Sequence, residues 1–207
     1  NGNMVDVLEG RREIQDILIE SETGISIISG GNGLDEILAL NNDNTNNIIR
    51  AFAALEGQFD VMIVDISAGA NQSVLSFLSA CQYQIVIGTN EPSSVADAYA
   101  LIKLIHLTMG LSEIIFVPNK VKTAQEGKVL FEKMNTIAAK FLGVALKFIG
   151  SVSESSDYSL AWNTGQAAVS IGVSTTCYHD FSAIVDELDK LTVNHKKNEL
   201  QFFNSMK

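Results

Sequence analysis

Apolar and polar positions follow two patterns along the chain: short, mainly apolar runs, and longer stretches with a helical period. The short runs predict strands at residues 25–28, 61–64, 84–87, 114–117 and 146–149, and the runs at 61–64 and 114–117 contain no polar residue. Apolar residues three and four positions apart predict helices at residues 45–55, 72–80, 93–109, 124–142, 158–162 and 178–191. A strand without polar positions is buried on both faces, which is typical of a parallel sheet covered by helices. The pattern therefore predicts an α/β fold, with a doubly wound, mostly parallel sheet and helices on both faces.

The regular pattern stops near residue 191. We expect one α/β domain over residues 1–191 and a polar tail over residues 192–207. Three apolar residues of the tail recur at near-helical spacing, Leu200, Phe203 and Met206. Phe202 falls outside this stripe. The tail is therefore either a short amphipathic helix for a membrane surface or a partner, or a solvated end of the chain.

Composition narrows the classes of function. With 207 residues, 46% of them hydrophobic and 18% charged, the chain can bury a sizeable core, which excludes disorder. The net charge of −10 argues against a specific nucleic-acid partner, because an acidic protein gains little from releasing phosphate counterions. Cys81 and Cys177 form no C-x-x-C pair, so they indicate neither a disulfide framework nor a zinc site. We expect a cytoplasmic protein, since the apolar runs are too short to cross a bilayer.

Charge is distributed unevenly along the chain. Residues 1–65 carry a net charge of −9, whereas residues 103–147 carry +4. The positive stretch is either a solvated helix face or a basic surface for an acidic partner or an anionic membrane.

Ligands of an open parallel sheet bind outside the carboxyl ends of its strands, so the residues that follow each apolar run are the candidates for chemistry. Asp65 ends the run at 61–64 either in the manner of a Walker B acid, which holds Mg²⁺ or its water, or as the ordinary acid that ends many strands. Gly69 follows four residues later and could donate its N–H to a γ-phosphate. Asn119 follows the run at 114–117, and its side-chain amide offers the donor and acceptor that match an adenine edge, although a turn residue has the same pattern.

A glycine-rich segment, S-G-G-N-G, occupies residues 29–33. Its glycines could expose N–H groups to a phosphate, or could simply form a turn. A P-loop requires G-x-x-x-x-G-K-[ST], and no segment of the 207 residues completes this pattern.

Two segments carry a resemblance to a known family. The segment D-V-M-I-V-D-I-S-A-G at residues 60–69 resembles the switch II segment of the MinD/ParA (deviant Walker A) ATPases. The segment T-N-E-P-S-S at residues 89–94, with D-A-Y-A-L-I-K at 97–103, is similar to the FlhG/FleN branch of MinD-like regulators of flagellar number and placement. Shorter matches at residues 6–10 and 141–144 extend the resemblance over roughly residues 4–190.

The resemblance implies a P-loop NTPase fold and an ATP-dependent switch that uses Mg²⁺ and dimerises around two nucleotides. It implies that Asp65 is the catalytic Walker B-type acid that holds Mg²⁺, directly or through water, that Gly69 senses the γ-phosphate, and that Asn119 binds the adenine. It also implies a flagellar GTPase or a transcriptional activator as partner, and peripheral association with the inner face of the cell membrane.

The chain departs from the family pattern in three places. The signature loop with its phosphate-binding lysines is absent, and the family's second acid on the first strands is missing with it. We therefore expect an N-terminally truncated piece that does not hydrolyse ATP alone, with ATPase activity confined to the full-length protein. Ser153 and Ser155 replace a proline and an acid of the second adenine-side loop. The alternative, from another class, is a non-catalytic interaction module that binds flagellar or transcriptional partners.

Overall fold

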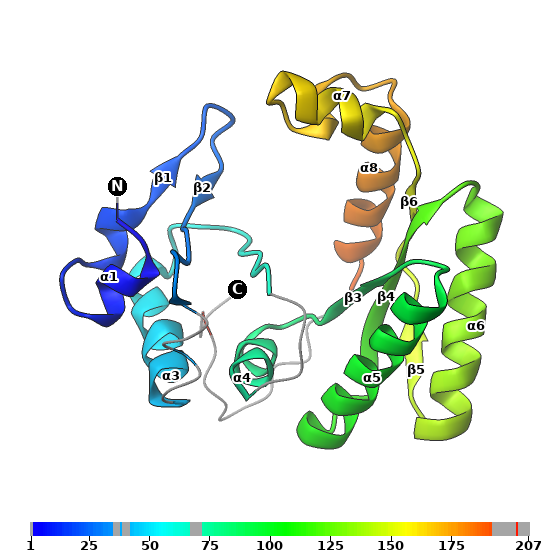
Figure 1. Ribbon diagram of the computed structural model, residues 1–207, viewed down its shortest axis with the longest axis horizontal. Coiled ribbons are helices and arrows are strands. Elements are labelled where there is room, and N and C mark those ends of the chain that lie inside the picture. The colour runs from blue at the N-terminus through cyan, green and yellow to red at the C-terminus, as the bar shows by residue number, and fades with distance from the viewer. Residues whose placement is uncertain (1, 35–37, 39–41, 67–71, 192–201, 203–207) are drawn as a thin grey trace. The chain divides into compact units, whose positions relative to one another are not determined.

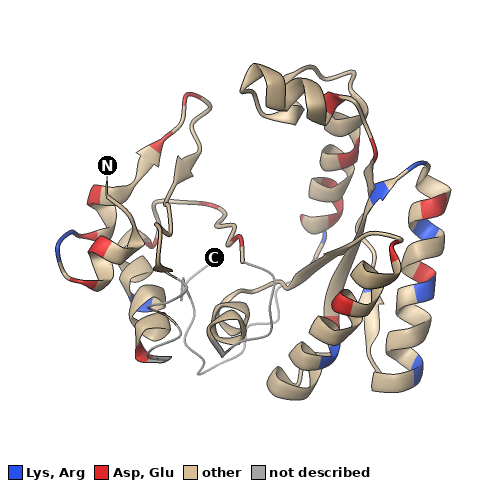
Figure 2. Cartoon of the chain, in the orientation of Figure 1, with Lys and Arg blue, Asp and Glu red and all other residues tan. Residues whose placement is uncertain are grey.

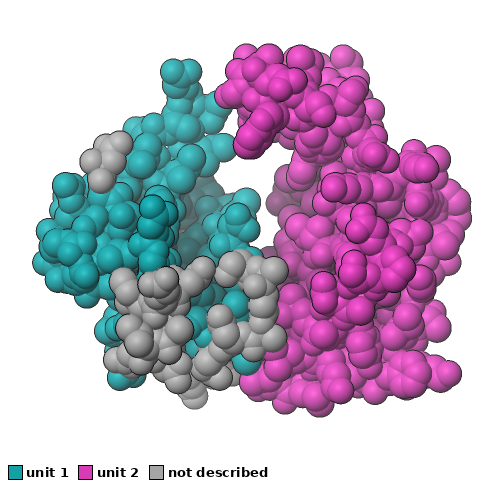
Figure 3. Space-filling model, in the orientation of Figure 1, with its two compact units in different colours: residues 1–82, 195–207 teal, residues 83–194 magenta. Residues whose placement is uncertain are grey.

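A computed structural model of the chain describes residues 2–34, 38, 42–66, 72–191 and 202. The chain divides into two compact units, one formed by residues 1–82 with 195–207 and the other by residues 83–194 (Figure 3). The single domain over residues 1–191 stays a prediction. Of the tail over residues 192–207, the structure describes Phe202.

The first unit combines short helices with a two-stranded hairpin (Figure 1). Its elements are α1 (Met4–Leu8), η1 (Ile14–Ile17), β1 (Ile19–Glu20), β2 (Ser26–Ile27), α3 (Asn42–Ala51), η2 (Phe52–Leu55) and α4 (Gln72–Ala80). Side chains from most of these elements form an apolar core, whose most buried members are Met4, Ile14, Ile17, Leu38, Ile48 and Leu55. The helix predicted at 45–55 therefore forms as α3 and η2, and it buries the apolar stripe that predicted it.

The predicted strand at 25–28 forms only in part, as β2, and outside the parallel sheet. It pairs antiparallel with β1, with Ile19 opposite Ile27. The turn between the two strands contains Gly24 at φ +79°, a left-handed conformation that glycine adopts without strain. The N–H of Ser21 donates to the carbonyl of Ile25 at 2.8 Å, which closes the hairpin. Because the turn places β1 beside β2, the backbone of β2 finds its hydrogen-bond partner in the hairpin and not in the parallel sheet.

The second unit is an α/β layer structure (Figure 1). Its elements are β3 (Ile85–Gly88), α5 (Pro92–Met109), β4 (Glu113–Val121), α6 (Ala124–Leu142), β5 (Ala145–Lys147), β6 (Val152–Ser153), α7 (Asp157–Thr164), η3 (Ala168–Ser170) and α8 (Thr176–Leu188). Every strand pair is parallel: β4 lies between β3 and β5, and β6 pairs with the last residues of β4.

Strand β4 is the centre of this unit, since Ile114 to Val117 are each at most 4% exposed. Phe116 lies near Ala98 and the backbone of Gly88, on the side of α5, and α6 packs beside α5. Ile115 and Val117 pack with Ile184 of α8. Helices therefore cover both faces of a parallel sheet, which confirms the predicted fold class.

Helix ends in this unit follow from their sequence. Thr123 caps the start of α6 by accepting the N–H of Glu126 at 3.1 Å, and Gly110 and Gly143 end α5 and α6 in the left-handed conformation. Within the described part of the chain, every helix is too short or too polar to traverse a lipid bilayer.

The predicted strand at 61–64 is wrong. Residues 61–66 form no regular secondary structure, and Val61 and Ile63 are 73% and 88% exposed. Met62 and Val64 pack instead against the cluster of Ile49 and Ala80. Side chains thus alternate inward and outward as in a strand, but no described segment pairs with this backbone, and a strand exists only with a hydrogen-bonded neighbour.

Candidate functional site

The carboxyl edge of the second-unit sheet is where a ligand of this fold would lie. Gly88 at the end of β3 pairs with Pro118 of β4, so Thr89 and Asn119 follow side by side. Ser94 of α5 accepts the N–H of Thr89 at 2.9 Å through its hydroxyl. This bond holds the segment 89–94, which carries part of the family resemblance, against the start of α5.

Asn119 lies inside β4 and not in a loop after it, because the last residues of β4 continue the sheet with β6. Asn119 pairs with Val152 and Val121 pairs with Ser153, with a bulge between the two pairs. The bulge residue is Lys120 at φ +54°, a left-handed conformation that costs free energy in a residue other than glycine. Strained backbone at the ligand edge of a sheet is typical of functional sites.

The side chain of Asn119 is half-buried, and its Oδ1 accepts the N–H of Lys120 at 2.9 Å. Within the described part of the chain, its NH₂ group has no hydrogen-bond partner and stays available as a donor. The geometry therefore leaves the NH₂ group of Asn119 free to donate to a ring nitrogen of a base, while its Oδ1 accepts the N–H of Lys120 at the bulge.

The loop after β5 runs beside Asn119. The N–H of Ser153 donates to Oδ2 of Asp180 at 2.7 Å, and the N–H of Glu154 donates to the carbonyl of Val121 at 2.8 Å. The hydroxyl of Ser155 accepts the N–H of Asp157 at 3.1 Å at the start of α7. The two serines that replace the family's proline and acid are thus built into the local hydrogen bonding of this loop.

Asp65 belongs to the first unit, where it is exposed at the end of the extended segment 61–66. Gly69 lies outside the described residues. No group of three His, Cys, Asp or Glu side chains that could hold a metal occurs among the described residues. A single carboxylate still fits Mg²⁺, because this ion is commonly held by one or two carboxylates together with waters and the phosphates of a nucleotide.

The glycine-rich segment at 29–33 has a structural role in the first unit. A Cβ on Gly31 would lie 2.5 Å from Cγ of Asn3, and the N–H of Met4 donates to the carbonyl of Ser29 at 2.9 Å. The side chain of Asn3 caps α1 by accepting the N–H of Val5 at 2.9 Å. The glycine therefore makes room for a helix cap, which favours the turn over the phosphate loop.

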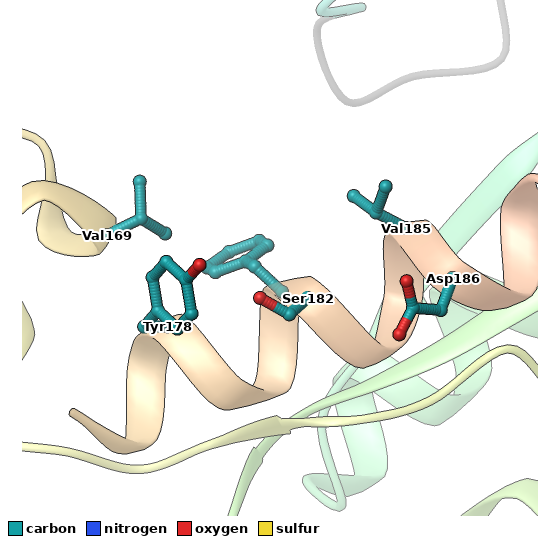
Figure 4. A pocket seen from close by; sticks show the side chains of 6 residues that line it. Val169, Tyr178, Ser182, Val185 and Asp186 are labelled. Atoms are coloured by element: carbon teal, nitrogen blue, oxygen red, sulfur yellow. The ribbon is translucent and has the colours of Figure 1, made fainter. Parts of the chain in front are cut away.

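An apolar pocket on α8 was missed by the sequence reasoning (Figure 4). Its volume is about 250 Å³, and its lining includes Val169, Tyr178 and Phe181. The apolar residues of α8 indicate a helix but do not tell which of them face the sheet. The sequence signal that could have found the pocket is that α8 has more apolar residues than one buried stripe requires.

The fold class is that of the MinD cell-division ATPases. The structure superposes on MinD of Aquifex aeolicus with a TM-score of 0.70 at 18% identity, covering 95% of this chain and 78% of that one. It superposes on MinD of Pyrococcus horikoshii, solved with Mg-ADP, with a TM-score of 0.66 at 15% identity, covering 92% and 74%. At these identities the likeness shows the fold alone.

Sequence comparisons identify the branch of the family to which the chain belongs. No protein-family model matches the chain. The chain is 30% identical over 201 residues to the antiactivator FleN of Pseudomonas aeruginosa, covering 97% of this chain and 72% of FleN. It is 28% identical over 158 residues to the flagellum site-determining protein YlxH of Helicobacter pylori, covering 74% of this chain and 52% of YlxH. The chain belongs to the FlhG/FleN branch of the MinD/ParA family, which confirms the resemblance.

Proposed function

We propose that this chain is part of a MinD-like, ATP-dependent molecular switch that regulates the number or placement of flagella. The observation that carries the proposal is the 30% identity with the antiactivator FleN, which extends over nearly the whole chain. The donor of Asn119, held at a strained bulge on the ligand edge of a parallel sheet, supports a nucleotide as ligand.

Three residues are assigned roles in this proposal. Asp65 holds Mg²⁺ directly or through a water, and the ion would neutralise the charge of the β- and γ-phosphates. Gly69 senses the γ-phosphate through its N–H. Asn119 donates to the adenine. The exposure of Asp65 fits this role, since a carboxylate buried in an ion pair would not be free to hold a metal.

The proposed switch acts as an ATP-bound homodimer of the full-length protein in the cytoplasm. Its partners are a flagellar GTPase or a transcriptional activator, and it associates peripherally with the cell membrane. The tail at 193–207 contributes to membrane attachment, and dimerisation would double the number of tails and so strengthen weak binding.

The 207 residues by themselves are not expected to hydrolyse ATP, because no G-x-x-x-x-G-K-[ST] loop occurs in them. The second candidate function is a non-catalytic adaptor that binds flagellar or transcriptional partners, and absence of such a loop from the complete gene would favour it.

Measuring the hydrolysis of Mg-ATP by the product of the complete gene distinguishes the ATP-dependent switch from the adaptor. We expect hydrolysis, and we expect Asp65→Ala to lower kcat by about 100-fold or more, because the metal contributes several kcal/mol of charge stabilisation. Asp60→Ala is the matched control, since Asp60 is an exposed carboxylate beside the same segment. Its turnover should stay within about twofold of the wild type.

Calorimetry with Mg-ATP completes the test, and the 207-residue chain should give no measurable heat of binding. A gene product that binds partners but hydrolyses no ATP would establish the adaptor. Equal turnover of Asp65→Ala and wild type would remove Asp65 from the site.

A further inference from the structure

Helix α8 carries two apolar stripes where a surface helix needs one. The buried stripe contains Cys177 and Ile184, which are 0% and 8% exposed. The second stripe contains Tyr178, Phe181 and Val185, which are 36%, 39% and 51% exposed. Their spacing of three and four residues places them on one side of the helix. Three large exposed side chains on one helix face are more than the single scattered apolar residues of an ordinary surface.

This second stripe forms one wall of the pocket on α8. Val169 of η3 lies opposite Tyr178, and Ser182 and Asp186 complete the α8 side (Figure 4). The volume of about 250 Å³ is below the range of 300–1,000 Å³ that is typical of small-molecule sites. A depression of this size beside an apolar stripe instead fits an anchoring side chain of a partner helix.

Helix α8 carries acidic residues (Figure 2). Asp186 lines the pocket and Asp189 follows one turn later, and both are exposed. Lys190, the nearby cation, is bound to Oε1 of Glu187 at 2.7 Å. Neither Asp186 nor Asp189 has an ion pair within the described ranges. Lys190 also interacts electrostatically with Asp186, so the acidic rim formed by Asp186, Glu187 and Asp189 is compensated only in part and keeps an excess of negative charge.

We propose that the exposed face of α8, with Val169, docks an amphipathic helix of a partner protein that carries Lys or Arg beside its apolar stripe. In helix-in-groove recognition, the docked helix places apolar residues at i, i+3 or i+4, and i+7 against the groove. The acidic rim of α8 favours basic residues beside these apolar residues on the docked helix. A second copy would bring Asp186 near the acids of the same face, since a two-fold interface pairs like with like. An anionic membrane would be repelled by the same rim.

The test uses the 207-residue chain and a defined probe, a fluorescein-labelled 14-residue helical peptide with leucine on one face and lysine on the flanks. A twin peptide with glutamate in place of lysine tests the charge. Fluorescence anisotropy measures Kd, and circular dichroism checks that each variant is folded.

We expect the lysine peptide to bind, and the glutamate peptide to bind at least about 10-fold more weakly. Phe181→Ser and Val185→Lys should each raise Kd about 10-fold or more, as for anchors at the centre of an interface. Asp186→Asn combined with Asp189→Asn should raise Kd severalfold and flatten its salt dependence. The matched control is Leu107→Ser, because Leu107 is 67% exposed on α5, and its Kd should stay within about twofold.

Three outcomes would overturn the proposal. One is equal weakening by Leu107→Ser, which would mean non-specific adhesion. Another is equal affinity for the two peptides. The third is a dimer in sedimentation that Phe181→Ser dissociates, which would make the face a self-association surface. Unfolding of Phe181→Ser alone leaves Val185→Lys to decide, since that side chain is half exposed and its replacement removes little core.

Discussion

Replacing Phe202 by alanine is expected to destabilise the first unit, although Phe202 is separated from most of that unit by more than a hundred residues. Its side chain is 5% exposed and joins Ile49 and Ala80 in an apolar cluster. Its ring lies 5.2 Å from that of Phe52, edge to face, and 6.0 Å from that of Phe77, stacked. Its N–H donates to the carbonyl of Ala80 at 3.4 Å.

The magnitude follows from these contacts. Burying a phenylalanine side chain contributes about 1.5–3 kcal/mol, and each aromatic pair adds about 0.5–1.5 kcal/mol. The sum agrees with the range of about 3–5 kcal/mol measured for Phe→Ala in protein cores. With a denaturant slope of about 1–3 kcal/mol/M, the urea midpoint of the first unit should fall by about 1–5 M.

The two units carry separate probes for this assay. Trp162, the only tryptophan, lies in the second unit, and its fluorescence reports on that unit. Cys81 packs at the edge of the Phe202 cluster, and its labelling by a thiol reagent during urea unfolding, located by peptide mass spectrometry, reports on the first. The labelling midpoint should shift while the Trp162 transition stays. Ile25→Ala is the control within the same unit, because Ile25 is 62% exposed.

A shift of the labelling midpoint below about 0.3 M, which is the size expected of a surface substitution, would refute this account of Phe202.

The prediction also bears on the tail, because deleting residues 193–207 would remove a core side chain together with the lysines. The proposed membrane role is better tested by Lys196→Gln with Lys197→Gln in liposome sedimentation of the ATP-loaded full-length protein. Equal pelleting of this variant and the wild type would exclude an electrostatic role for the tail.

Three further predictions concern single contacts. Gly127→Ala should destabilise the second unit by about 1–3 kcal/mol in urea unfolding, because the new Cβ would lie 2.6 Å from Oγ of Ser151, and Ser151→Gly should restore stability if that contact is the cause. Asp180→Ala should cost about 1–3 kcal/mol and speed hydrogen exchange at the amide of Ser153, which loses its acceptor; unchanged exchange would contradict the bond. Burial raises the pKa of Cys81 from 9.0 to about 11, so native alkylation at pH 8.5 should be slow. Because the unfolded thiol ionises first, the stability of the first unit should fall as pH rises from about 9 to 11, and Cys81→Ala should abolish this part of the fall.

Local patterns determined several elements of both units. The uninterrupted apolar run at 114–117 predicts a strand buried on both faces, and β4 is that strand, because apolar side chains lose no hydrogen bonds to water when they are buried. The helices predicted at 72–80 and 124–142 coincide with α4 and α6, since helical period and end signals such as Gly143 act within a few residues. The resemblance in segments 60–69 and 89–103 likewise needed no structure to indicate the family.

Only the tertiary structure decided features that depend on a distant partner. The run at 61–64 has the composition of a strand, but no described segment bonds to its backbone, so Val61 and Ile63 are exposed. Asn119 lies in a strand because β6, some thirty residues later, pairs with the end of β4. Phe202 is buried although it falls outside the apolar stripe of the tail. In each case the deciding contact joins residues far apart in the chain, and hydrophobic period carries no information about such contacts.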